Sequence, residues 1–342
     1  MQTINDAVCF SCLEKLDQKR VNVDIGNYHA ACSMAVFGSQ TPPKLLLKKS
    51  EIYSPATFEK SQRSMSISGV QTKISLQFSH ARDQLVPSGT DASFLLKPSP
   101  DGYEQCSEGE LLGLVSAKLG GMECPPGALV RLLDGHLSYL IRRFDRDLYG
   151  NKTHRVEDMT QIMNIERDEK GIFKYGSSYE EAIQNARVAT GNKLSTSAEL
   201  LKRLVHTYLF ANGDYHLKNI SLVARKEESG HLLSAVSPVY DVVPTSIWLT
   251  REKPLALCLL KEEAEGRFSE RYEALGFHSR FDFLELAKRL EIGQKYALQV
   301  FTRQIEVARK TILIARDAQL FSEERFEIFQ HEVCDRVKKI QT

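Results

Sequence analysis

Between residues 66 and 146 the hydrophobic positions fall into short runs separated by Gly and Pro turns. The runs read KISLQF, SFLLKP, ALVRLL and LSYLIRRF. Short runs rich in β-branched and aromatic residues, bounded by turn residues, are typical of β-strands. This part of the chain is therefore predicted to form a small sheet lobe.

Helical spacing of apolar residues marks one segment between these runs and most of the chain after residue 147. The first helix is predicted to begin with a capping box, Ser107 with Glu110, and to end at Gly120 and Gly121. The later segments with this spacing are 179–188, which begins with a second capping box, 198–211, 281–290, 295–316 and 323–338. The second half is expected to be a larger helical lobe, which makes the fold class α+β.

Composition and charge narrow the class of protein. The chain has 342 residues and is 42% hydrophobic, which is ordinary for a soluble globular protein of two or three subdomains. Its 45 Lys and Arg residues nearly balance 44 Asp and Glu residues, so bulk charge favours neither nucleic acid nor an anionic membrane as the main partner. We find no apolar run long enough for a membrane helix and no secretory signal, so a cytoplasmic location with reduced cysteines is expected.

The amino-terminal segment differs from the rest in its cysteine spacing. It contains Cys9-x2-Cys12 and, after sixteen intervening residues, His29-x2-Cys32, the spacing of a structural zinc site. Ordinary packing of reduced cysteines is the alternative interpretation. Because a Pro-containing break, GSQTPPK, follows, the predicted domains are 1–42, a small Cys/His segment, 43–146, the sheet lobe, and 147–342, the helical lobe.

The stretch NGDYHLKNISL places Asp214 and Asn219 in a loop between a predicted helix and a strand-like run. A phosphoryl-transfer site needs a carboxylate to orient the attacking hydroxyl and a neutral oxygen ligand for Mg²⁺. Asp241 is predicted to stand at the end of a short apolar strand and to be a second metal ligand. Taken singly, the stretch with Asp214 and Asn219 could be an Asx-rich turn, and Asp241 could be a turn former. Lys218 could neutralise charge on the transferred group.

Lys97 lies in the middle of the apolar run FLLKP, where an unpaired ammonium would be costly. The phosphates of a nucleotide are a suitable anion, and Glu110 could pair with the lysine and hold it. The alternatives are a snorkelling lysine on an edge strand and a glutamate that caps a helix. Upstream, SMSISGVQTK offers a Ser/Gly turn whose hydroxyls, Ser66 and Ser68, could receive a phosphoryl group and so inhibit nucleotide binding.

The order of these features resembles the HipA family of bacterial serine/threonine kinases, the toxins of HipBA-type toxin-antitoxin systems. The resemblance spans residues 64–245, with weaker helical agreement to the end. It implies a bilobal protein-kinase-like fold with a small β-rich N-lobe and a larger helical C-lobe. It also implies that ATP and Mg²⁺ are used, that Asp214 is the catalytic residue, with Lys218 beside it, and that Asn219 and Asp241 are the metal ligands.

The same resemblance implies a nucleotide-binding set and an autophosphorylation site. The residues expected at the nucleotide are Ser68, Gly69, Val70 and Gln71 of the phosphate loop, Lys97, Glu110, Arg142 and Phe144 of the adenine hinge, and His216 as a packing and orienting residue. Ser66 is expected to be autophosphorylated, with Ser68 a second candidate. The stretch VEDMTQ, residues 156–161, resembles a family segment at the lobe interface.

Only about sixty residues precede the phosphate loop, so we expect a short form similar to the HipT toxins of three-gene HipBST systems. The resemblance then implies antitoxins of HipB and HipS type, contact with DNA only through the antitoxin, and an aminoacyl-tRNA synthetase as the protein substrate. Two other functions fit parts of the sequence: a small-molecule phosphotransferase of the aminoglycoside-kinase type, and an adaptor with an inactive kinase fold.

Overall fold

The computed structural model describes residues 4, 7–16, 27–52, 71–79, 81, 83–89, 91–226, 232–249 and 252–342. These residues belong to two compact units. Unit 1 comprises Met1–Val115, Cys124–His154 and Leu313–Phe326, and unit 2 comprises Ser116–Glu123, Arg155–Ile312 and Glu327–Thr342. The three-part division expected from the sequence stays a prediction.

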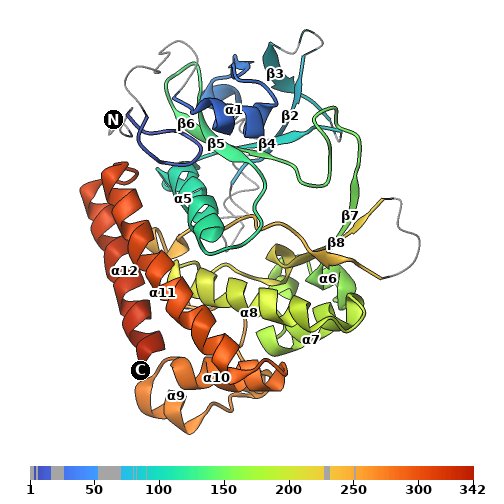
Figure 1. Ribbon diagram of the computed structural model, residues 1–342, viewed down its shortest axis with the longest axis vertical. Coiled ribbons are helices and arrows are strands. Elements are labelled where there is room, and N and C mark those ends of the chain that lie inside the picture. The colour runs from blue at the N-terminus through green and yellow to red at the C-terminus, as the bar shows by residue number, and fades with distance from the viewer. Residues whose placement is uncertain are drawn as a thin grey trace. The chain divides into compact units, whose positions relative to one another are not determined.

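Unit 1 contains a six-stranded sheet in the order β1-β3-β2-β4-β6-β5 (Figure 1). Its strands are β1 (Lys44–Leu45), β2 (Ile74–Phe78), β3 (Gln84–Pro87), β4 (Phe94–Pro98), β5 (Gly127–Arg131) and β6 (Leu137–Arg142). β1 pairs with β3 in parallel, and the other neighbours are antiparallel. β2, β4, β5 and β6 coincide with the four predicted runs, which confirms the β-rich character of this part of the chain.

Each face of this sheet is covered by a helix. Alternate strand positions such as Phe94 and Leu96 share one face, because successive side chains point to opposite sides of a strand. The helix α1 (Ala30–Phe37) packs on that face, and the short α2 (Lys49–Ile52) adds Ile52 to the same core. Lys97, between buried positions, points to the other face, where the helix α5 (Cys106–Leu119) lies.

The start of α5 differs from the prediction. Ser107 does not precede the helix but lies inside it, since α5 begins at Cys106. The Ser107 amide donates to Ser99 Oγ (2.9 Å) and its hydroxyl donates to the Lys97 carbonyl (2.9 Å). Glu110 pairs with the Lys97 side chain. Contacts with β4 and the turn after it have therefore replaced the local capping box that the spacing predicted.

Unit 2 is mainly helical, as predicted. Its helices are α6 (Met159–Ile162), α7 (Tyr179–Ala189), α8 (Leu194–Leu209), α9 (Glu270–Leu275), α10 (Arg280–Arg289), most of α11 (Gln294–Asp317) and most of α12 (Glu323–Gln341). Short 3₁₀ turns lie at η2 (Ile172–Tyr175), η3 (Leu217–Asn219), η4 (Thr245–Ile247) and η5 (Lys261–Glu265). α7, α8, α10, α11 and α12 match the predicted segments, whereas the shorter helices were too brief to show a period.

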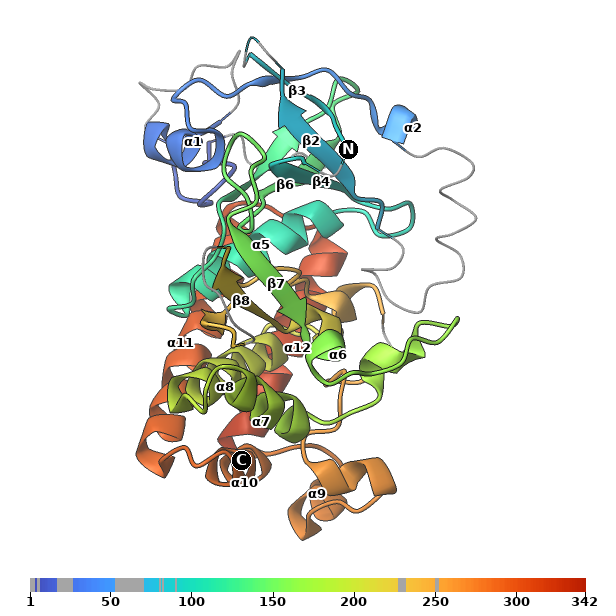
Figure 2. The ribbon, with the colours of Figure 1, turned by 90° about the vertical axis from the view of Figure 1, so that its right-hand side faces the viewer.

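A second sheet has the order β7-β8-β9 and lies beside α6 and α8 in Figure 2. Its strands are β7 (His154–Asp158), β8 (Ser221–Arg225) and β9 (Ala235–Val236). Asp158 ends β7 and forms a capping box with Gln161 at the start of α6. Ser178 caps α7 by accepting from the Glu181 amide, as the sequence predicted.

The position of Asp241 corrects one expectation. The sequence predicted a strand directly before it, but β9 ends at Val236 and the segment from 237 to 244 is irregular. Val239, Val242 and Val243 are buried as loop residues, so the apolar pattern reflects packing of a loop rather than strand pairing. Among the described residues, no helix combines the length and the apolar content that crossing a bilayer requires.

Candidate functional site

Lys97 and Glu110 form a buried ion pair in unit 1. The Lys97 ammonium donates to Glu110 Oε1, and the two side chains are only 4% and 1% exposed. Leaving either charge alone at this depth would cost several kcal/mol, so each side chain requires the other. The interpretation of Lys97 as a snorkelling residue on an edge strand is wrong, because β4 lies between β2 and β6.

The described end of the predicted phosphate loop reaches this pair. Gln71 is buried, and its Nε2 donates to Glu110 Oε2 over a long 3.5 Å. The other predicted loop residues, Ser66, Ser68, Gly69 and Val70, lie outside the described residues. The structure thus brings Gln71 to the ion pair, and the nucleotide-binding roles of Gln71, of the pair and of the four loop residues stay predictions.

The predicted adenine hinge follows β6. Arg142 is the last residue of β6, and its amide donates to the Pro126 carbonyl (2.9 Å). Partial burial lowers the pKa of Arg142, and nearby Asp147 opposes that shift. Phe144, two residues further, is half-buried. The stretch is thus fixed at one end by the sheet, and its contact with a nucleotide stays a prediction.

In unit 2, the loop from 212 to 219 connects α8 to β8 and is held by its own polar groups. Asn212 Oδ1 accepts from the Asp214 amide (2.9 Å), and the Gly213 amide donates to Thr245 Oγ1 (2.8 Å). The Asp214 carbonyl accepts from the His216 amide and from Asn219 Nδ2, both at 2.9 Å. A loop held at so many points keeps its side chains in one arrangement, which is what a preorganised site requires.

Asp214 itself is 5% exposed and has an acceptor atom already engaged. The hydroxyl of Tyr175, in η2, donates to Asp214 Oδ1 at 2.7 Å. Tyr175 was not predicted from the sequence, because nothing in the spacing of two residues 39 positions apart indicates contact. The carboxylate therefore already accepts a hydrogen bond from a hydroxyl within unit 2.

His216 packs against the same carboxylate as a neutral ring. Its Nε2 lies 3.7 Å from Asp214 Oδ1, and its ring meets the Tyr175 ring edge-on at 5.3 Å. The pKa of His216 is lowered to about 3, mainly by burial and next by the positive charge of Lys174, while Asp241 partly opposes the shift. Among the described residues, neither ring nitrogen has a hydrogen-bond partner. This environment fits the predicted packing role and does not fit a base.

Asp241 is joined to the loop through its neighbour Tyr240. The Tyr240 hydroxyl donates to the Lys218 carbonyl (3.0 Å) and accepts from Ser221 Oγ (2.6 Å). Asp241 has a left-handed backbone, φ 54°, a conformation that is uncommon for a residue with a side chain and that Asp tolerates better than most. The contacts of Tyr240 thus connect the segment that contains Asp241 to the loop that contains Asp214.

The oxygen atoms of this loop suit a hard cation. Carboxylate and amide oxygens are the ligands that Mg²⁺ prefers. Asn219 uses its Nδ2 to donate to the Asp214 carbonyl, so its Oδ1 is the end that can ligate a metal. Lys218 differs from its buried neighbours Leu217 and Asn219 in being exposed. The donor set fits the predicted magnesium site, and the roles of Asn219, Asp241 and Lys218 stay predictions.

Gly213 was not identified from the sequence, yet its missing side chain matters. A Cβ at this position would lie 2.4 Å from Glu252 Oε2 and 2.5 Å from the Lys253 carbonyl. Glu252 is itself held by the Thr245 hydroxyl, and burial raises its pKa to about 7. The loop and the segment after residue 252 therefore approach each other as closely as glycine permits.

We expect Gly213→Ala to destabilise unit 2 by about 1–3 kcal/mol, the usual cost of overpacking, and to displace the loop. The measurement is the free energy of unfolding in urea, beside the exposed control Gly89→Ala, whose added Cβ meets nothing within 4 Å. A Gly213→Ala protein as stable as the control would contradict the close approach.

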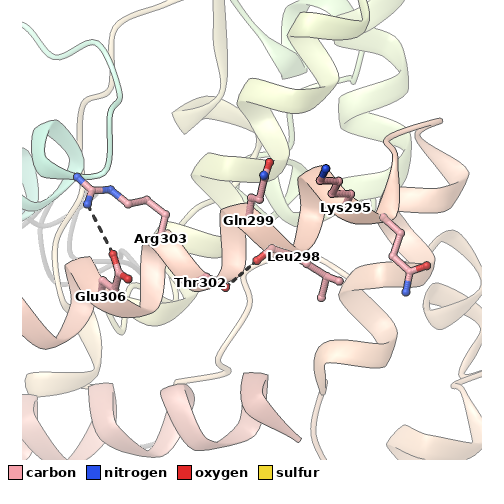
Figure 3. Close-up of a pocket in the computed structure, with 7 residues that line it drawn as sticks. Lys295, Leu298, Gln299, Thr302, Arg303 and Glu306 are labelled. Atoms are coloured by element: carbon pink, nitrogen blue, oxygen red, sulfur yellow. Dashed lines mark hydrogen bonds and ion pairs between the residues drawn. The ribbon is translucent and has the colours of Figure 1, made fainter.

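Two further features of the described residues lie outside these loops. The ligand atoms of Cys9, Cys12, His29 and Cys32 all lie within 4.8 Å of one another, so the structure brings the predicted zinc ligands together. A shallow pocket of about 640 Å³ is lined by α11 alone (Figure 3). Its lining residues are Gln294, Lys295, Leu298, Gln299, Thr302, Arg303 and Glu306, none of which was predicted to be functional.

Known proteins resemble this chain in sequence and in fold. A putative kinase of Haemophilus influenzae is 30% identical over 262 residues, which cover 71% of this chain and 72% of that protein. Putative kinase Y4dM of Sinorhizobium fredii is 29% identical over 264 residues, 72% of this chain and 57% of that protein. HipA of Shewanella oneidensis, solved with HipB and operator DNA, has a TM-score of 0.57 at 16% identity and covers 90% of this chain and 76% of its own.

The structural likeness shows a HipA-like α+β fold, in agreement with the predicted fold class. The amino-acid sequence also indicates the family, because the model of the HipA-like C-terminal domain family matches residues 65–312. That match contains β2 to β9, the buried Lys97–Glu110 pair, and the loop with Asp214 and Asn219. The chain therefore belongs to the HipA-like C-terminal domain family.

Proposed function

We propose that this chain is an ATP-dependent serine/threonine protein kinase and the toxin of a HipBST- or HipBA-like toxin-antitoxin system. The observation that carries the proposal is the loop of unit 2, in which a nearly buried Asp214 is fixed by its own backbone and accepts from a hydroxyl. The relatives named putative kinases support the same class.

In this proposal the residues of unit 2 perform the transfer step. Asp214 Oδ1 accepts a hydrogen bond from the substrate hydroxyl and orients it for in-line attack. Asn219 Oδ1 and the Asp241 carboxylate hold Mg²⁺, and the exposed Lys218 neutralises charge on the transferred group. His216, neutral because of its burial, packs against Asp214 and keeps the carboxylate in place.

The residues of unit 1 bind the nucleotide in this proposal. When bound, ATP with Mg²⁺ supplies the γ-phosphoryl group and the charge that stabilises its transfer. Lys97 binds the phosphates, and Glu110 fixes the position of its ammonium. Gln71, with Ser68, Gly69 and Val70, belongs to the phosphate loop, and the segment from Arg142 to Phe144 meets the adenine.

The regulation and the partners proposed for this chain are those that its resemblance to the HipA family implies. We propose that Ser66 and Ser68 are autophosphorylated, that the protein substrate is an aminoacyl-tRNA synthetase, and that antitoxins of HipB and HipS type inhibit the kinase. The Shewanella structure contains HipA together with HipB and operator DNA, which supports an antitoxin partner that contacts DNA.

One experiment tests the reaction class and the substrate together. Cells expressing the wild type and cells expressing Asp214→Ala are compared by phosphoproteomics, and purified protein is incubated with radiolabelled ATP. We expect phosphorylated proteins, and labelled chain, only with the wild type, and loss of the self-label in a variant with Ser66→Ala and Ser68→Ala. Label transferred to small molecules and to no protein would favour an aminoglycoside-type phosphotransferase instead.

We expect Tyr175→Phe to raise the rate of phosphoryl transfer at subsaturating protein substrate by about tenfold. The Tyr175 hydroxyl donates to Asp214 Oδ1, so it must leave before a substrate hydroxyl can take its place. A hydrogen bond to a charged group is worth roughly 1.5 kcal/mol or more, and about 1.4 kcal/mol corresponds to a factor of ten. The measurement is kcat/KM for a peptide or protein substrate.

The exposed Tyr149→Phe serves as the matched control and is expected to leave kcat/KM unchanged. If Tyr175→Phe instead lowers kcat about tenfold with KM unaltered, then Tyr175 orients Asp214 during catalysis and does not compete with the substrate.

A further inference from the structure

We propose that Cys9, Cys12, His29 and Cys32 bind a structural Zn²⁺ ion, and that this ion attaches the amino-terminal segment to the edge of the unit 1 sheet. Three sulfur atoms and one nitrogen atom, all within 4.8 Å of one another, form a Cys₃His set. Zn–S bonds of about 2.3 Å in a tetrahedron place ligand atoms roughly 3.5–4 Å apart. The Cys12 Sγ to His29 Nδ1 distance, 3.3 Å, is already near that range.

The histidine has the orientation that a metal ligand needs. His29 Nε2 lies 3.2 Å from the Lys15 carbonyl, which can only accept, so the proton belongs on Nε2. The lone pair is then on Nδ1, the atom that faces Cys12. Fixing the tautomer of a ligand through its other ring nitrogen is a regular feature of zinc sites.

The backbone around the cysteines also has the form of a metal-binding turn. The Leu13 amide donates to the Cys9 carbonyl (2.9 Å), and Leu13 has φ 60°, a left-handed conformation that a leucine adopts at a cost. An antiparallel bridge between Val8 and Lys15 closes the turn. The second pair lies at the start of α1, with His29 as N-cap and Cys32 in the first turn.

Packing of reduced cysteines explains this arrangement less well. Among the four, Cys9 is buried, but Cys12, His29 and Cys32 are only partly so, and a free thiol gains its stability from apolar burial. The left-handed backbone of Leu13 is costly, and partial burial of the neighbouring ligand side chains is a weak means of holding it in place. A Zn²⁺ ion supplies a stronger constraint, because the free energy of metal binding adds directly to the stability of the segment that it closes.

The segment that contains the four ligands contacts the outer edge of β5. β5 is the last strand in the sheet order, so one row of its backbone groups has no strand partner within that sheet. The Leu129 amide donates to the Phe10 carbonyl (2.7 Å), and Ser11 Oγ donates to the Gly127 carbonyl (2.8 Å). Tyr28 donates its hydroxyl to the Leu129 carbonyl. Residues next to both ligand pairs therefore form hydrogen bonds with backbone groups on the outer edge of β5.

Metal content of the full chain provides the first test. Protein purified from zinc-supplemented cells, without a metal-chelating tag, is analysed by plasma mass spectrometry. We expect one zinc per chain in the wild type and in Cys334→Ser, whose cysteine is exposed and lies in α12. Cys32→Ser is expected to contain little zinc. A wild type that carries no zinc and takes up none on titration would overturn the proposal.

Two further measurements use the wild type alone, so their results do not depend on whether a variant folds. Wild type reconstituted with Co²⁺ should show the visible absorption of a tetrahedral thiolate site, and its absence would also overturn the assignment of the ligands. Hydrogen exchange of the Leu129 amide should accelerate at least tenfold when the wild type is treated with a chelator. Unchanged exchange would show that the ion does not hold the segment on β5. None of these readouts depends on kinase activity.

Discussion

Asp214→Asn is expected to lower the rate of phosphoryl transfer by about 10²- to 10⁴-fold, the contribution that a positioned general base usually makes. Asparagine has the same shape as aspartate but has no charged oxygen to attract and orient the substrate hydroxyl. Its amide oxygen can still accept from Tyr175, and the loop is held by backbone groups that the substitution does not alter. The fold should therefore survive while the chemistry is lost.

The measurement is kcat with radiolabelled ATP, made beside the midpoint of thermal unfolding. The matched control is Asp335→Asn in α12, a 39%-exposed carboxylate paired with Lys339, which should retain full activity. A fully active Asp214→Asn protein would remove this residue from the reaction. A large fall in the midpoint of thermal unfolding would show that the carboxylate is needed for folding. The activities of the two proteins would then be compared at a temperature at which both are folded.

Elements with a clear local period were predictable, and elements shaped by distant contacts were not. The strands β4 and β6 and the long helices α11 and α12 have a repeating apolar face that fixes their type. The start of α5 differs because Ser107 finds partners in Ser99 and in the Lys97 carbonyl. Contacts of this kind depend on the fold as a whole and leave no trace in the spacing of neighbouring residues.

The same distinction applies to the candidate site. Asp214 and Asn219 lie within one short loop, so their spacing alone was enough to predict a catalytic residue and a metal ligand there, and these roles stay predictions. Tyr175 and Gly213 act through residues far along the chain, Asp214 for one and Glu252 for the other. The Cys/His cluster was predictable because two short motifs contain all four residues, whereas the strand that this segment contacts could not be named before the sheet order was known.

Removing either member of the Lys97–Glu110 pair is expected to destabilise the protein by about 3–5 kcal/mol, because the partner then remains as an uncompensated buried charge. The variants are Lys97→Met and Glu110→Gln, and the measurement is the free energy of unfolding in urea. The pair Lys49–Asp101, whose aspartate side chain is 72% exposed, provides the control, since Asp101→Asn should cost no more than about 1 kcal/mol. Equal costs for both pairs would contradict the burial of the first.

The double variant Lys97→Met with Glu110→Leu separates stability from function. Replacing both members of a buried ion pair by apolar residues is often neutral, so most of the lost stability should return. If Lys97 binds the phosphates of ATP, activity should nevertheless stay at least 10²-fold below that of the wild type, because methionine offers no charge to the nucleotide. A double variant that regained both stability and activity would show that the pair serves only to hold β4 and α5 together.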